Sequence, residues 1–190
     1  MAEPLRREPL PLTYLTVGRI VVCQGDPASR PLVVVSGALE ERCLSSDGRE
    51  LVLAILGPGD LATPPQGRPS HGTVRAVRVA RVREALPREI PALLAARAER
   101  SSELACDLAW LDVAGRLERR LDDLANRFGR AVEGGVLIDL FLTQSDLAAL
   151  VGASREHVNR ALGSLDRSGR IRRGSRGRYV VRPALRSVGA

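Results

Sequence analysis

The sequence contains no lysine, so that all 29 of its basic residues are arginine. Aromatic residues make up only 3% of the chain, and there are three cysteines and two histidines. Cys23, Cys43 and Cys106 form no C-x-x-C pair, so we expect neither a disulfide framework nor a zinc site, and we expect these thiols to be buried as small apolar groups. His71 and His157 stand apart from them, and we therefore expect no metal site and no cofactor.

Long apolar stretches are also missing. No run approaches the ~18 residues that a membrane-spanning helix needs. Residues 1–9 lack the basic-then-apolar order of a secretory signal. With 44% hydrophobic and 27% charged residues, the composition is that of a folded chain of one or two domains. We expect a soluble, cytoplasmic protein with no membrane partner.

Positive charge is concentrated at one end of the sequence. Ten arginines and four acidic residues lie between Val136 and Ala190, which gives this part a net charge of +6. The whole chain carries +7, so the first 135 residues are nearly neutral. A basic module attached to a neutral body favours a polyanionic partner such as double-stranded DNA.

The first third of the chain has the pattern of short strands. Apolar runs at 32–35 and 51–56 end at Ser36-Gly37 and at Gly57-Pro58-Gly59, and Ser45-Ser46-Asp47-Gly48 predicts a turn between them. Residues 73–82 alternate apolar side chains with arginines and predict a further strand. The sequence therefore predicts an α+β fold whose first domain, residues 1–88, is a small antiparallel β-barrel.

A helix is predicted next, over residues 89–111, with Pro91 in its first turn. Leu104, Leu108 and Leu111 have the spacing of one apolar helix face. This face can pack on its own domain or can pair with a second copy of the chain, and we favour the dimer. Asp112 is suited to cap a second helix, which opens a third region, residues 112–190, and whose apolar positions are Leu117, Leu121, Leu124 and Phe128.

A helix-turn-helix is predicted at residues 143–169, after a strand-like run at 136–142. Thr143 or Ser145 can cap a first short helix, Gly152 supplies the turn, and Ser154 can cap the second helix. The apolar positions of the two helices are Leu147, Leu150 and Val151, followed by Val158, Leu162 and Leu165.

The second helix leaves polar residues outside its apolar face, in its first two turns. Arginine can bind guanine through two hydrogen bonds, glutamate can accept from cytosine, and asparagine can pair with adenine or phosphate. The alternative is a solvated face with a weak Glu156–Arg160 pair. We predict that the base-reading residues are Arg155, Glu156, Asn159 and Arg160.

Residues 171–181 predict a strand, a Gly-rich turn and a strand, which would form a wing beside this helix. Contacts from a wing to the phosphate backbone fix the register of a protein on DNA without reading its sequence. A hairpin with merely solvated arginines is the alternative. We predict phosphate contacts from Thr143, Ser154, Arg172, Arg173, Arg176 and Arg178.

Two stretches resemble the cyclic-AMP receptor protein and fumarate–nitrate regulator (Crp/Fnr) family of bacterial regulators. The segment from Val151 to Arg160 is similar to the family's G-x-S-R-E-x-V-x-R recognition motif, and the segment from Asp107 to Leu117 resembles the end of its dimer helix. The resemblance implies a degenerate cyclic-nucleotide-binding-like barrel, a dimerisation helix and a winged helix-turn-helix.

The resemblance also implies roles for particular residues. Arg155 and Arg160 would each contact guanine, and Glu156 would contact cytosine, in a palindrome with half-sites similar to TGTGA. Asn159 departs from the small residue common in this family, which puts the flanking base preference in doubt. A homodimer would place its two recognition helices roughly 34 Å apart, one turn of DNA. RNA polymerase is the further partner that the family implies.

The effector site departs from the family pattern. Gly59-Asp60-Leu61 is followed by a segment several residues too short, which contains no glutamate for a ribose hydroxyl and three prolines that withhold amide donors. The residues left as candidate effector contacts are Arg68, Ser70, His71, Ser101 and Ser102.

We therefore predict a regulator that works without cyclic AMP, with gating by a small molecule as the alternative. A ligand-binding or protein-interaction module that does not read DNA is the other alternative. The N-terminal cysteine cluster of an iron–sulfur sensor is missing, and no nucleophile–base pair or paired carboxylates suggest an enzyme.

Overall fold

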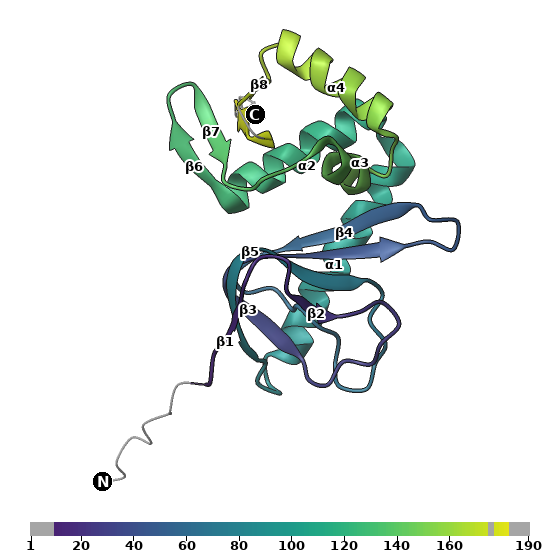
Figure 1. The fold of residues 1–190 in the computed structure, drawn as a ribbon, viewed down its shortest axis with the longest axis vertical. Helices are drawn as coiled ribbons and strands as arrows, with labels where there is room; N and C mark the ends of the chain where they lie inside the picture. The colour runs from purple at the N-terminus through teal and green to yellow at the C-terminus, as the bar shows by residue number, and fades with distance from the viewer. Residues whose placement is uncertain (1–9, 175–176, 183–190) are drawn as a thin grey trace, which may run out of the picture.

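The computed structural model of the chain describes residues 10–174 and 177–182 (Figure 1). Its N-terminal half is an antiparallel sheet in the order β1-β5-β3-β4, in which β2 also pairs with β5. Leu39, Leu56, Val74 and Val82 are among the fully buried side chains of this half. The predicted barrel is thus an open sheet rather than a closed one. Its strands are β1 (Thr13–Leu15), β2 (Ile20–Val22), β3 (Leu32–Leu44), β4 (Glu50–Leu56) and β5 (Thr73–Glu84).

The strand predicted to end at Ser36-Gly37 continues to Leu44, so that prediction is wrong. Gly37 has a φ of +86°, and a Cβ at this position would collide with the backbone of β5 at Val79. The register with β5 shifts on both sides of Ser36. This glycine therefore marks an irregularity at which two strands approach closely, and not a strand end. The turn predicted at residues 45–48 is confirmed by a hydrogen bond from Gly48 N to Ser45 O.

Two helices link the halves of the molecule. Helix α1 (Ile90–Trp110) has Pro91 in its first turn, and α2 (Val113–Phe128) is capped by Asp112, whose side chain accepts from Gly115 N at 2.8 Å. Both predictions are confirmed. The predicted apolar positions of α2 are all buried, as Leu117, Leu121, Leu124 and Phe128.

The C-terminal half holds two further helices and a small antiparallel sheet in the order β6-β7-β9-β8. The strand predicted over residues 136–142 ends at Ile138. Beyond it, Asp139 N donates to Phe128 O and Leu142 N donates to Gly177 O. The hairpin of β6 with β7 was not predicted from the sequence. The elements are β6 (Gly129–Val132), β7 (Gly135–Ile138), α3 (Gln144–Val151), α4 (Arg155–Arg167), β8 (Ile171–Arg173) and β9 (Tyr179–Val181).

The two halves share one core. Figure 1 shows α3 directly above β4, and Val52 and Ile55 of β4 belong to the same buried cluster as Leu147 and Leu150 of α3. Helix α4 lies on the far side of α3 and α2, away from the N-terminal sheet. The sheet therefore supports the helix pair from one side and leaves its other side open.

The cysteine prediction is wrong in part. Cys23 is exposed, and Cys43 and Cys106 are only half-buried, so none of the three is a fully buried apolar group. Among the residues that the structure describes, no helix combines the length and the apolar character needed to cross a bilayer.

An ion pair at the start of α1 gives a pH-dependent contribution to stability. Arg83 donates to both carboxylate oxygens of Glu89, at 2.7 and 2.8 Å, and Leu86 N donates to the same group. Together these bonds lower the pKa of Glu89 from 4.5 to about 2. Because the folded-state pKa is depressed, the stabilisation is present above pH 4.5 and is lost as the pH falls toward 2.

We expect Glu89→Gln to lower the thermal midpoint at pH 7, and the difference from wild type to shrink as the pH falls toward about 2. Thermal unfolding, monitored by circular dichroism across this pH range, measures the difference between the two midpoints. Glu84→Gln is the matched control, because Glu84 meets Arg30 only at 3.8 Å and both side chains are half-exposed. A difference that stays constant with pH would contradict the assignment of this pair.

Candidate nucleic-acid interface

The first helix of the pair, α3, is fixed at both ends as the sequence predicted. Thr143 Oγ1 accepts from Asp146 N at 3.1 Å, while the Asp146 carboxylate accepts from Thr143 N at 3.0 Å. These two bonds form a capping box. Gly152 ends the helix in the left-handed conformation, with a φ of +61°. The turn to the next helix is therefore tight.

The second helix, α4, begins after Ser154, whose hydroxyl accepts from His157 N at 3.3 Å. Val158, Leu162 and Leu165 are buried against the rest of the domain, and Leu162 is completely inaccessible to solvent. The predicted apolar face of this helix is confirmed. Its opposite face is consequently directed outward.

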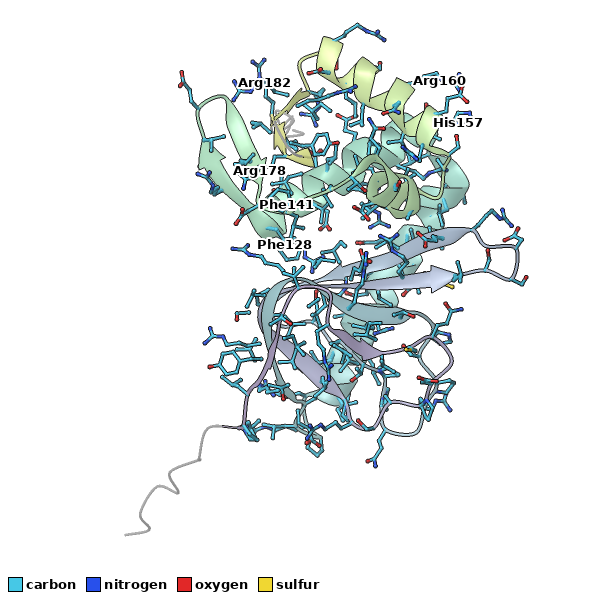
Figure 2. The ribbon with its side chains drawn as sticks, viewed as in Figure 1. Phe128, Phe141, His157, Arg160, Arg178 and Arg182 are labelled. Atoms are coloured by element: carbon cyan, nitrogen blue, oxygen red, sulfur yellow. The ribbon has the colours of Figure 1, made fainter. Side chains whose placement is uncertain are left out.

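All four predicted base-reading residues lie on that outer face and are exposed: Arg155, Glu156, Asn159 and Arg160. The Glu156–Arg160 pair spans 3.7 Å with side chains that are 80% and 65% exposed, so it holds neither group firmly. Asn159 donates to Gln144 on α3 at 3.0 Å. Figure 2 shows Arg160 at the outer edge of the molecule. Two guanidinium groups and a carboxylate are thus available to a partner.

His157 is a residue that the sequence interpretation missed. It is exposed in the first turn of α4, with Nδ1 2.7 Å from Ser154 Oγ, and Figure 2 shows it beside Arg160. The helical spacing that turns Arg160 outward also turns His157 outward. That spacing could therefore have identified it.

The predicted phosphate contacts are not gathered at one place. The Thr143 hydroxyl already donates to Asp146 at 2.6 Å, and Ser154 Oγ is engaged with His157. Arg172 is exposed and donates to Glu133 O at 3.2 Å, and Arg173 lies 3.6 Å from Asp166. These bonds compete with phosphate for the same donors.

Arg178 occupies a different part of the domain. Its guanidinium stacks over the Phe141 ring at 5.1 Å, and Phe141 is 64% exposed. Figure 2 places both at the opposite end of the C-terminal domain from His157 and Arg160. Phe141 was expected inside a strand, and Arg176 lies outside the described residues.

A cavity of about 270 Å³ lies between the N-terminal sheet and α1. Of the candidate effector residues, His71 and Ser101 line it, together with Arg97 and Arg100. Arg68 lines a neighbouring hollow beside Pro64 and Pro65. Ser70 is buried and donates to Gly72 O, and Ser102 is exposed and donates to Ala98 O, so neither lines this cavity.

The cavity contains a buried ion pair that the sequence did not reveal. Glu41 of β3 has a side chain only 3% exposed, and Arg97 Nη2 lies 2.5 Å from its Oε1. Arg97 also donates to Leu61 O at 3.3 Å. The pair thereby ties α1 to the sheet across the cavity. Residues 41 and 97 are far apart in the sequence, and no local pattern predicted their contact.

The predicted dimer face of α1 is mostly turned toward the molecule itself. Leu104 is buried on its own chain at 7% exposure, and Leu108 and Leu111 are half-buried. The alternative of packing on the same chain is therefore correct for Leu104. Another side of the helix is exposed and carries small residues at three- and four-residue spacing, of which Ala105 also lines the edge of the cavity: Ala95, Ala98, Ser102, Ala105 and Ala109.

Comparison with known proteins gives two family matches that follow the two halves of the structure. Residues 12–96 match a cyclic nucleotide-binding domain, and residues 115–187 match a Crp-like helix-turn-helix domain. The CRP-like cAMP-activated global transcriptional regulator of Mycobacterium tuberculosis is 36% identical over 172 residues, which cover 82% of this chain and 77% of that protein. The cAMP-activated regulator CRP of Escherichia coli is 27% identical over 164 residues, 77% of this chain and 78% of that protein.

Solved structures agree on the fold. A CRP/FNR family transcriptional regulator from Thermus thermophilus has a TM-score of 0.78 at 22% identity, covering 91% of this chain and 94% of the other. FixK2 from Bradyrhizobium japonicum has a TM-score of 0.76 at 22% identity, with coverages of 93% and 94%. Regulators with a Crp-like helix-turn-helix bind DNA and act as dimers. The chain belongs to the Crp/Fnr family, which is a family of transcription regulators and not of enzymes.

Proposed function

We propose that this chain is a cytoplasmic, homodimeric transcription regulator that binds a palindrome with TGTGA-like half-sites without needing cyclic AMP. In this proposal residues 1–88 form a degenerate sensing domain, residues 89–111 the dimerisation helix, and residues 112–190 the DNA-reading domain. RNA polymerase is its further partner. The observation that carries the proposal is the outer face of α4, which presents Arg155, Glu156 and Arg160 to solvent.

The chemistry of this face suits the major groove. An arginine that donates two hydrogen bonds to O6 and N7 selects guanine, and a carboxylate that accepts from N4 selects cytosine. The first turns of a recognition helix are the part that enters the groove, and all three residues lie there. TGTGA pairs with TCACA, so one half-site offers two guanines on one strand and cytosines on the other.

Dimerisation is proposed through the exposed face of α1. Leu104 is already buried within its own chain, so the surface left for a second copy is the stripe of small residues from Ala95 to Ala109. Small side chains let two helices approach closely, because the distance between helix axes depends on the side chains at the contact. Trp110, 78% exposed at the end of α1, adds apolar area beside this stripe.

Independence from cyclic AMP is supported by the contents of the cavity. Its fully buried charged group is the carboxylate of Glu41, which would repel a cyclic phosphate, and Arg97 is already paired with it. A volume of about 270 Å³ lies just below the usual range of small-molecule sites, about 300–1,000 Å³. The internal ion pair joins α1 to the sheet without any ligand.

Effector gating is the second candidate function. The relatives from Mycobacterium tuberculosis and Escherichia coli are both described as cAMP-activated. Arg100 and Ser101 still line the cavity beside α1, where Arg100 pairs with Asp60 at 3.1 Å and Ser101 donates to Arg97 O, so an anionic ligand would compete with these partners. A ligand that bound one orientation of the reading domain more tightly would shift the population toward it.

Selection of bound sites from random double-stranded DNA, with and without cyclic AMP, tests the proposal. We expect a palindrome with TGTGA-like half-sites to be enriched equally in both arms, and calorimetry to detect no heat of cyclic AMP binding. Enrichment only with cyclic AMP would establish the gated alternative. If no sequence is enriched and all fragments bind equally, sequence-specific regulation is wrong and the arginine-rich surface binds DNA through charge alone.

A further inference from the structure

Arg42 is a half-buried arginine surrounded by carboxylates from both halves of the molecule. It lies on β3 with its side chain 16% exposed. Its guanidinium contacts Glu40 at 3.0 Å, Glu50 at 2.6 Å and Asp146 at 2.8 Å. The first two partners belong to the N-terminal sheet, and the third lies on α3. One side chain therefore joins the sheet to the helix-turn-helix.

Asp146 has two tasks in this contact. Its Oδ2 accepts from Thr143 and completes the capping box of α3, while its Oδ1 accepts from Arg42. Burial opposes ionisation of this carboxyl, but the bonds from Thr143 and Arg42 outweigh it and hold the pKa of Asp146 below its usual value. The carboxylate is therefore charged at neutral pH, and the start of α3 is fixed to its own helix and to β3 together.

The surrounding contacts allow little sliding between the two surfaces. Val52 and Ile55 of β4 share a buried cluster with the apolar residues of α3. Two further ion pairs, Arg78–Asp139 at 3.0 Å and Arg127–Asp60 at 2.5 Å, cross the same boundary. None of these contacts uses the outer face of α4, whose polar residues remain exposed. The docked arrangement is thus compatible with a partner on α4.

We propose that Arg42 is a positioning residue that holds each helix-turn-helix at one orientation on its sheet, and so sets the half-site spacing that the dimer accepts. This inference rests on the proposed dimeric DNA reader. Two DNA-binding domains on flexible linkers can bind half-sites at several separations. Two domains held rigidly bind both half-sites together only when the half-site separation matches the distance between the two recognition helices. Because one base pair also rotates a half-site about 34–36° around the DNA axis, a rigid dimer discriminates single-base-pair changes.

Arg42→Met removes the contact from the sheet, and Asp146→Asn weakens it from α3 while leaving an oxygen that can cap the helix. Arg49→Met is the matched control, because Arg49 lies on the same hairpin and is 85% exposed, and within the described part of the chain it forms an ion pair only with Asp47. The probes are the selected palindrome, the same palindrome with its spacer changed by one or two base pairs, and DNA with a single half-site. Binding is measured by fluorescence anisotropy, and folding by thermal unfolding.

We expect wild type and Arg49→Met to bind the matched palindrome about tenfold more tightly than the palindromes with altered spacers, as a rigid bivalent protein would. Arg42→Met and Asp146→Asn are expected to reduce this discrimination measurably, because the shared apolar cluster and the other two ion pairs remain, while binding the single half-site as wild type does. If Arg42→Met does not fold, Asp146→Asn carries the test, because Arg42 then keeps Glu40 and Glu50.

Unchanged spacer discrimination in a folded variant would overturn the positioning role. Tighter binding of the matched palindrome by the variants would overturn it too, since the contact would then be inhibitory. If wild type itself binds the palindrome no better than the single half-site, the dimeric reader is wrong and the positioning role falls with it. The single half-site measurement separates these cases, because it depends on α4 and not on the sheet.

Discussion

Arg155→Ala is expected to weaken binding to the preferred operator by about 1–3 kcal/mol per half-site and to relax the preference at one base position. The guanidinium is exposed in the first turn of α4, where a bidentate contact with guanine can form. Alanine removes that contact and leaves the guanine edge to water. Fluorescence anisotropy against the operator and its single-base variants measures both effects.

Arg167→Ala is the matched control, because Arg167 is also exposed on α4 but lies in its last turn. Arg167 has the same charge as Arg155 but lies far from the bases that the first turns of α4 would reach. Its replacement by alanine should therefore leave the base preference intact. Equal weakening of operator and unrelated DNA by Arg155→Ala would show that Arg155 contacts phosphate instead. The base-reading assignment of α4 would then be wrong.

Leu162→Ala is expected to lower the free energy of unfolding by about 2–5 kcal/mol, because Leu162 is completely buried in the shared core and its truncation leaves a cavity. This side chain holds α4 against the rest of its domain. We expect a lower midpoint in urea denaturation, and DNA binding that disappears at a lower temperature than in wild type.

Leu44→Ala is the control for size and residue type, since Leu44 is 53% exposed at the end of β3. Its effect should stay within about 0.5 kcal/mol, as is usual for exposed positions. If Leu162→Ala lowers the free energy of unfolding by less than about 1 kcal/mol, the packing of Leu162 in this core does not hold α4 in place.

The helix-turn-helix could be predicted from sequence because its determinants are local. The helix caps at Thr143 and Ser154 bond to backbone groups three residues away. Gly152 is needed because its own backbone adopts the left-handed conformation. The apolar spacing of Val158, Leu162 and Leu165 follows from the helical period. The same holds for Asp112 at the start of α2. Local rules therefore fixed both the elements and their outward residues.

Features that depend on distant partners could not be predicted in this way. Gly37 had the pattern of a strand end, because only the approach of β5 makes a glycine necessary inside β3. Leu104 fitted a dimer face equally well, since spacing defines a face but not what covers it. The Glu41–Arg97 pair joins residues from two elements that only tertiary packing brings together.

The cluster shared by β4 and α3 also has an energetic consequence. Since the same buried side chains stabilise the nucleotide-binding-like half and the reading half, neither can loosen without loss to the other. Thermodynamic linkage then requires reciprocity: DNA that binds the native protein raises the resistance of β4 to local opening, because Val52 and Ile55 of this strand lie in the shared cluster. Amide hydrogens in β4, which lies on the other side of α3 from α4, would exchange more slowly when DNA is bound.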